Sequence, residues 1–145
     1  MTSGTLQLEV VEARLTRDTQ SIGKMDPYLM ITMRQQKFQT QPHSSGGKTP
    51  TWEETFEINV KNVGDDITIK VCNKNLTSDD TVSIYFISSL IPVIIYACAQ
   101  IGATSISASS LCLEAGVDDW FPIQFKGKQS GQVHLKSTWR PDATA

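Results

Sequence analysis

The stretch TWEETFEINV, residues 51–60, decides the fold class, because apolar and polar side chains alternate along it. Alternation with a period of two predicts an extended strand with one face in the core, and here that face carries Trp52, Phe56 and Ile58. The pattern recurs along the chain, with turn-forming residues between its copies. The predicted strands are residues 5–13, 27–33, 37–40, 51–60, 67–71, 101–107, 119–125 and 132–139. About eight short strands without an amphipathic helix predict an all-β, antiparallel, eight-stranded β-sandwich.

Length and composition fit a single domain over residues 1–145 and exclude several functions. The formal net charge is −2 and the basic residues form no dense run, so nucleic acid is not a predicted partner. The sequence has no phosphate-binding glycine loop, nucleophile elbow or metal-ligand cluster, so no enzyme is predicted. His43 and His134 are assigned surface or packing roles. Three scattered cysteines and the lack of a signal peptide predict reduced thiols, without a disulfide framework, in a cytoplasmic protein.

Three segments carry a combined pattern: residues 25–28, residues 50–56, and residues 71–75 followed by 79–80. In this order they resemble the C2 domain family, a β-sandwich that docks on phospholipid, often through calcium held in loops at one end. Residues 25–28 match the family's Asp-Pro-Tyr signature at the end of the first binding loop, and residues 50–56 match its Pro-x-Trp-x-Glu-x-Phe strand. Residues 71–75 followed by 79–80 match the third loop, where the family usually has Asp-x-Asp and then another Asp. The resemblance covers nearly the whole chain. The single strand before the first loop is similar to the second of the family's two topologies, as in small single-domain C2 proteins of plants and protists.

The resemblance implies a calcium site in which several acidic ligands have been replaced. The positions that match the family's ligands are Gln20, Asp26, Asn73, Asn75 and one of Asp79 or Asp80, and Asp18 is a further oxygen donor if the first loop bends. Calcium affinity depends on how many of the ligand oxygens belong to carboxylates. Weak or absent calcium binding is therefore expected. The alternative for the acidic residues is that Asp26 caps a turn and that residues 79–80 lie in a solvated loop.

Basic residues flank the same loops and are predicted to contact lipid: Arg17, Lys24 and Lys74. A lysine or arginine near an anionic membrane surface contributes about 1 kcal/mol, so several together can support docking without a metal. The predicted function is a phospholipid-binding module on an anionic membrane, peripheral and cytoplasmic, with calcium as a weak cofactor. The alternative is a calcium-independent module that binds a protein partner through a sheet face.

Residues 82–100 form an apolar insert that does not fit the resemblance, because no charged residue occurs between Asp80 and Glu114. Joining Thr81 to Ile101 restores the family's usual sequence. We therefore interpret residues 82–100 as a translated intron, a hypothesis that sequencing of the spliced transcript tests directly.

Two alternatives remain for the insert if the protein contains it. The first is a membrane-inserting hairpin at the lipid-facing end, with its turn at Pro92. The second is a spanning helix or a dimer contact, since the run is about as long as the shortest transmembrane helix. Flanking positive charge that would orient a spanning helix is lacking. Helical or weakly defined structure is expected in this segment.

Overall fold

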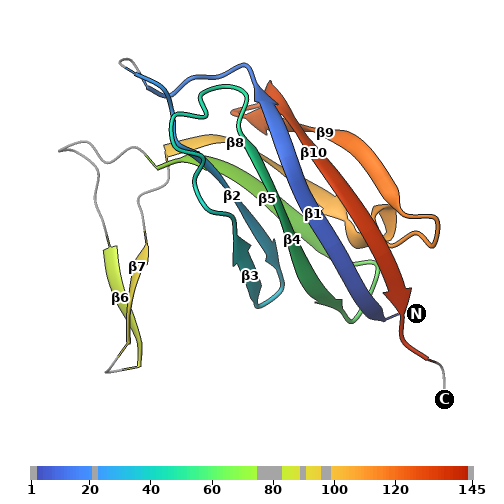
Figure 1. Cartoon of the computed structure of the whole chain (residues 1–145). Helices are drawn as coiled ribbons and strands as arrows, with labels where there is room; N and C mark the ends of the chain where they lie inside the picture. Colours follow the sequence, from blue (N-terminus) through green and yellow to red (C-terminus); the bar gives the residue numbers. More distant parts are fainter. Residues whose placement is uncertain (1–2, 21–22, 75–82, 89–90, 96–98, 144–145) are drawn as a thin grey trace.

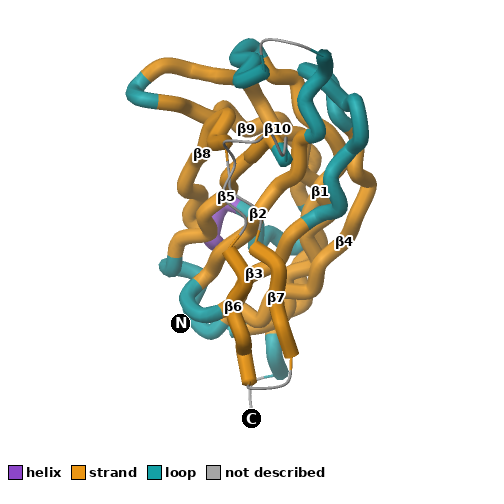
Figure 2. Tube along the Cα trace, turned by 90° about the vertical axis from the view of Figure 1, so that its left-hand side faces the viewer, coloured by secondary structure: helices purple, strands orange, loops and turns teal. Residues whose placement is uncertain are grey.

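The computed structural model describes residues 3–20, 23–74, 83–88, 91–95 and 99–143 of the chain. In this part strands are the main regular structure, and the 3₁₀ turn η1 (Ala108–Ser110) is the only helical element there (Figure 2). The strands are β1 (Gly4–Leu15), β2 (Pro27–Met33), β3 (Gln36–Gln39), β4 (Thr51–Val60), β5 (Asp66–Asn73), β6 (Ser83–Ser88), β7 (Ile91–Ile95), β8 (Ala99–Ser107), β9 (Val117–Phe125) and β10 (Lys128–Pro141). The all-β prediction is confirmed.

Eight strands form one antiparallel sheet in the order β3-β2-β5-β8-β9-β10-β1-β4 (Figure 1). The junction between β8 and β9 is short, with Ala103 opposite Gln124. On either side of this junction the pairing is extensive. The sheet therefore folds into two four-stranded halves, which pack their apolar faces together as a sandwich does.

A single core lies between the two halves, and the alternation read from the sequence places its side chains. Leu6, Leu8 and Val10 of β1 are fully buried, and so are the isoleucines and valine at alternate positions of β5. In β4, Ile58 is buried, whereas Trp52 and Phe56 are half-buried against the core. Burying one such large apolar side chain stabilises the fold by about 1.5–3 kcal/mol.

Both termini lie at one end of the sandwich, and the longer loops lie at the other (Figure 1). We call the second end the loop end. It comprises the first loop (residues 16–26), the second loop (residues 40–50), the end of β5 and the β9–β10 turn (residues 126–127). Backbone hydrogen bonds join these segments: Gly47 N–H to the Met25 carbonyl, Lys74 N–H to the Asp26 carbonyl, Leu15 N–H to the Lys48 carbonyl and Thr16 N–H to the Ser130 carbonyl.

The apolar insert contains the two strands β6 and β7, which pair with each other as a separate antiparallel sheet (Figure 1). The expectation of helical structure there is wrong, because these residues pair as strands. Pro92 lies within β7 opposite Phe86, so it does not mark the turn. In the described ranges no helix has the length and apolar content needed to cross a bilayer.

The cysteines differ from the sequence prediction at one position. Cys72, fully buried in β5, takes part in a disulfide. Cys112 is a free thiol, and burial raises its pKa to about 11. The expectation that all three thiols are reduced is therefore wrong. A sequence with an odd number of scattered cysteines does not show which of them approach one another in space.

Candidate functional site

The first loop is anchored to the sandwich by Met25, whose side chain is fully buried. The Met25 sulfur accepts hydrogen bonds from the Thr19 N–H at 3.4 Å and from the Thr19 hydroxyl at 3.6 Å. Met25 is followed by Asp26 and then by Pro27, the first residue of β2. The buried Met25 thus holds the Thr19 part of the loop against the start of β2.

Asn73, the last residue of β5, joins the first loop to the sheet through its side-chain amide. The Asn73 Oδ1 accepts a hydrogen bond from the Asp26 backbone N–H at 2.9 Å. Because that N–H can only donate, the amide oxygen must face Asp26 and the NH₂ group must face the other way. The NH₂ group donates to Thr19 Oγ1 at 3.2 Å and to Gln20 Oε1 at 3.3 Å. Asn73 is 1% exposed and its partners are half-buried, so these bonds are partly shielded from water.

The two described carboxylates of the predicted calcium site also bind backbone N–H groups. Asp18 Oδ1 accepts from the Gln20 N–H at 2.9 Å, which forms a local turn within the first loop. Asp26 Oδ1 accepts from the Ser45 N–H at 2.7 Å and so connects the first and second loops. Asp26, which directly precedes Pro27, therefore binds a backbone N–H of the second loop through its carboxylate.

The described part of this arrangement does not fit a calcium ion. Calcium needs several converging oxygens, preferably carboxylates. Asn73 instead directs an NH₂ group toward Thr19 and Gln20, and the Gln20 Oε1 already accepts one of its protons. No three histidine, cysteine, aspartate or glutamate side chains of the described residues are grouped so that they could hold a metal. Three other predicted ligands, Asn75, Asp79 and Asp80, lie outside the described residues.

The three basic residues predicted to contact lipid all belong to the loop end. The Lys24 side chain is exposed and lies next to Gly47 of the second loop. Lys74 follows Asn73 directly and is half-buried. Arg17 lies on another side of the first loop, where its guanidinium stacks on the Phe125 ring with 3.8 Å to the centroid. The structure thus places Lys24 and Lys74 close to Asp26, where the first loop bonds the end of β5, and Arg17 at the β9–β10 hairpin.

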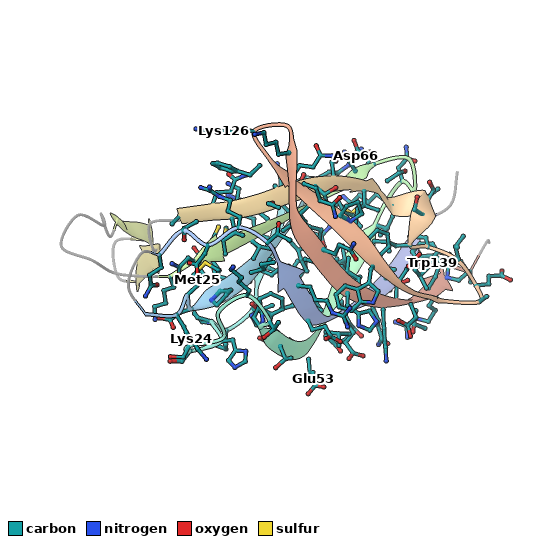
Figure 3. All side chains as sticks on the ribbon, turned by 90° about the horizontal axis from the view of Figure 1, so that it is seen from above. Lys24, Met25, Glu53, Asp66, Lys126 and Trp139 are labelled. Carbon is teal, nitrogen blue, oxygen red and sulfur yellow. The ribbon has the colours of Figure 1, made fainter. Side chains whose placement is uncertain are left out.

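Two further lysines of the loop end escaped the sequence analysis. Lys126 and Lys128 flank Gly127 in the β9–β10 turn and are exposed. Viewed from above, Lys126 lies at the upper edge of the molecule and Lys24 at the lower left (Figure 3). The antiparallel pairing of the first and last strands is the signal that could have placed this turn beside the first loop.

Comparisons with known proteins agree with this architecture. A model of the C2 domain family matches residues 4–123. The chain belongs to the C2 domain family. One relative, 16 kDa phloem protein 2 of Arabidopsis thaliana, is 34% identical over 83 residues, which cover 57% of this chain and 56% of that protein. The chain thus matches little more than half of that relative's length.

Two solved structures show the fold of this C2 domain. A single C2 domain of plant extended synaptotagmin 1 superposes with a TM-score of 0.72 at 14% identity, over 99% of both chains. The calcium-bound pair of C2 domains of extended synaptotagmin 2 gives a TM-score of 0.67 at 20% identity, over 96% of this chain and 46% of the other. At these identities the likeness concerns the fold alone.

A second polar cluster of the C2 domain lies on the outer face of β1, β10 and β9. His134 Nδ1 bonds Glu12 at 3.1 Å, and His134 Nε2 bonds Asp118. The Trp120 ring stacks on His134 at 4.9 Å, and the Arg14 guanidinium lies 4.5 Å from the centre of the Trp120 ring. Hydrogen bonds to Asp118 and Glu12 raise the pKa of His134, because ionised carboxylates can only accept.

This cluster predicts a pH-dependent loss of stability in the substitution His134→Gln. Because the pKa of His134 is higher in the folded than in the unfolded protein, protonated His134 stabilises the fold. This stabilisation is complete below the unfolded pKa of about 6.5 and disappears as the pH rises through the folded pKa. The difference in free energy of unfolding between wild type and His134→Gln should therefore be larger at about pH 6 than at about pH 9. Urea unfolding at both pH values measures it. An equal difference at both would contradict the ion-paired assignment.

Proposed function

We propose that this C2 domain docks on anionic phospholipid bilayers through its loop end and that the docking does not require calcium. Family membership supports a membrane-binding module, and the cations of the loop end supply attraction to phosphate-bearing headgroups. The association proposed is peripheral. The interacting surface comprises the first loop, Lys74 directly after β5, and the part of the second loop that lies beside Lys24.

The observation that carries the proposal is the hydrogen-bonded Asn73 amide. In a metal-dependent loop end, a cation brings together carboxylates that would otherwise repel one another. Here a neutral amide joins Asp26, Thr19 and Gln20 by direct hydrogen bonds. The loops are therefore held in place before any ligand arrives, and less conformational entropy is lost on docking.

The attraction expected from these cations is modest and depends on salt. Arg17, Lys24 and Lys74 together supply about 3 kcal/mol if each contributes about 1 kcal/mol at an anionic surface. Opposing charge on Asp18 and Asp26 reduces this sum. Since the Debye length shortens from about 10 Å at 0.1 M salt to about 3 Å at 1 M, binding should weaken steeply as salt is added.

Charge reversal in the first loop and directly after β5 tests the proposal. The double variant Lys24→Glu with Lys74→Glu should bind vesicles of phosphatidylcholine and phosphatidylserine at least about tenfold more weakly than wild type, because each attraction becomes a repulsion. Sedimentation with vesicles in a chelator measures the effect.

The matched control carries the same charge change at the opposite end of the sandwich. Lys37 and Lys61 are exposed there, in β3 and directly after β4. The double variant Lys37→Glu with Lys61→Glu should retain most of the binding. Equal loss in both double variants would mean that net charge alone drives the association. Unchanged binding in the Lys24 and Lys74 variant would contradict the proposal and favour a protein partner on a sheet face.

A further inference from the structure

The β9–β10 turn places a lysine where the backbone disfavours one. Lys126 and Gly127 have φ values of 51° and 81°, so both residues of this two-residue turn are left-handed. Turns of this kind favour asparagine, aspartate or glycine, and another residue costs about 1 kcal/mol at such a position. A side chain retained at an unfavourable backbone position is a reason to look for a function.

The hairpin is fixed to the first loop by a backbone bond and by an aromatic ring. The Thr16 N–H donates to the Ser130 carbonyl at 2.9 Å. The Phe125 ring, which precedes the turn, has the Arg17 guanidinium 3.8 Å from its centroid and the Lys126 ammonium 5.4 Å from it. Two cations of different segments therefore share one ring, and their positive charges are held close together.

The charges of this group are not neutralised within the described part of the chain. The salt bridges found there join Arg34 to Asp65 and His134 to two carboxylates, and none includes Arg17, Lys126 or Lys128. The Arg17 Nε is buried and has no hydrogen-bond partner.

We infer that the β9–β10 hairpin is a second contact with the anionic bilayer, in which phospholipid phosphates meet Lys126, Lys128 and Arg17. The inference rests on the proposed docking through the loop end and extends it to a different strand pair. Lys24 and the hairpin both belong to the loop end, where the first loop bonds the hairpin at Thr16 and the second loop at Met25. Viewed from above, Lys126 and Lys24 lie on opposite edges of the molecule (Figure 3). Two separated contacts would fix the tilt of the domain on the membrane, which a single contact leaves free.

The test compares charge-reversal variants in vesicle sedimentation, in a chelator, with vesicles of phosphatidylcholine and phosphatidylserine. Lys126→Glu with Lys128→Glu should raise the apparent dissociation constant by about tenfold or more, and the neutral pair Lys126→Gln with Lys128→Gln should give a smaller rise. The control Lys37→Glu with Lys61→Glu has the same net charge as the first variant and should bind nearly as wild type. Thermal unfolding should show that all variants remain folded.

The outcomes separate this inference from the proposed function. If the hairpin variant sediments as wild type while the Lys24 and Lys74 variant does not, the hairpin contact is wrong and the docking proposal stands. Equal loss in the hairpin variant and the Lys37 and Lys61 control would also overturn the hairpin contact. If wild type itself does not sediment, the proposed function fails and the hairpin contact fails with it.

Discussion

Replacing Asn73 by alanine is expected to lower the free energy of unfolding by about 3 kcal/mol, because three partly buried hydrogen bonds of a buried side chain are lost together. The substitution leaves the Asp26 N–H without its acceptor and removes the donor to Thr19 and Gln20. A buried donor without a partner alone costs about 1–3 kcal/mol. The loss is a large fraction of a typical domain stability of about 5–15 kcal/mol. Urea unfolding in a chelator measures it.

A half-buried asparagine whose hydrogen bond is open to water supplies the matched control. Asn62 accepts one hydrogen bond from the Gly64 N–H in the turn after β4, near the opposite end of the sandwich. Asn62→Ala should cost less than about 1 kcal/mol, since water can replace this bond. If Asn73→Ala costs no more than Asn62→Ala, the amide does not hold the first loop, and the metal-free account of the loop end loses its main support.

Replacing Gly131 by alanine should destabilise the domain by about 3 kcal/mol. Gly131 follows a register shift in β10 and has a φ of 151°, which side-chain-bearing residues rarely adopt. A Cβ there would lie 2.5 Å from the Arg14 carbonyl oxygen and 2.9 Å from the Leu15 Cα. Both are backbone atoms of the paired strand β1, so they can yield only if the strands separate. Thermal or urea unfolding measures the loss.

Gly127 is the matched control, because alanine there would meet the backbone strain of a positive φ without any crowding. It also has a positive φ, of 81°, but no atom lies within 4 Å of the Cβ that alanine would add. Gly127→Ala should therefore cost only about 1 kcal/mol, the usual penalty of a left-handed alanine. Equal effects of the two substitutions would show that β1 and β10 are not packed as closely at Gly131 as the structure indicates.

The strands could be predicted from the sequence because each buries one face. The β4 pattern, in which exposed residues alternate with partly or fully buried ones, follows the printed alternation directly. The predicted strand ends were less accurate. β1 continues to Leu15 and β10 to Pro141 through backbone pairing, which the alternation of apolar residues does not indicate. The strand pair β6–β7 was missed because a continuous apolar run has no period that distinguishes strand from helix.

The candidate site could be predicted in its location but not in its bonding. The family resemblance pointed to Asp18, Gln20, Asp26 and Asn73, and the structure brings these four residues together at the first loop. No sequence pattern shows that the Asn73 amide bonds across to that loop, since this depends on strand pairing between β2 and β5. His134 was assigned a surface role for the same reason, as its carboxylate partners come from neighbouring strands.

Sedimentation of the wild-type protein with phosphatidylserine-containing vesicles, once in calcium and once in a chelator, tests the central claim most directly. The account predicts that the same fraction of protein sediments in both buffers and that added salt reduces both fractions alike. Sedimentation in calcium alone would contradict it. That result would mean that a metal, and not the Asn73 amide, organises the loop end for docking.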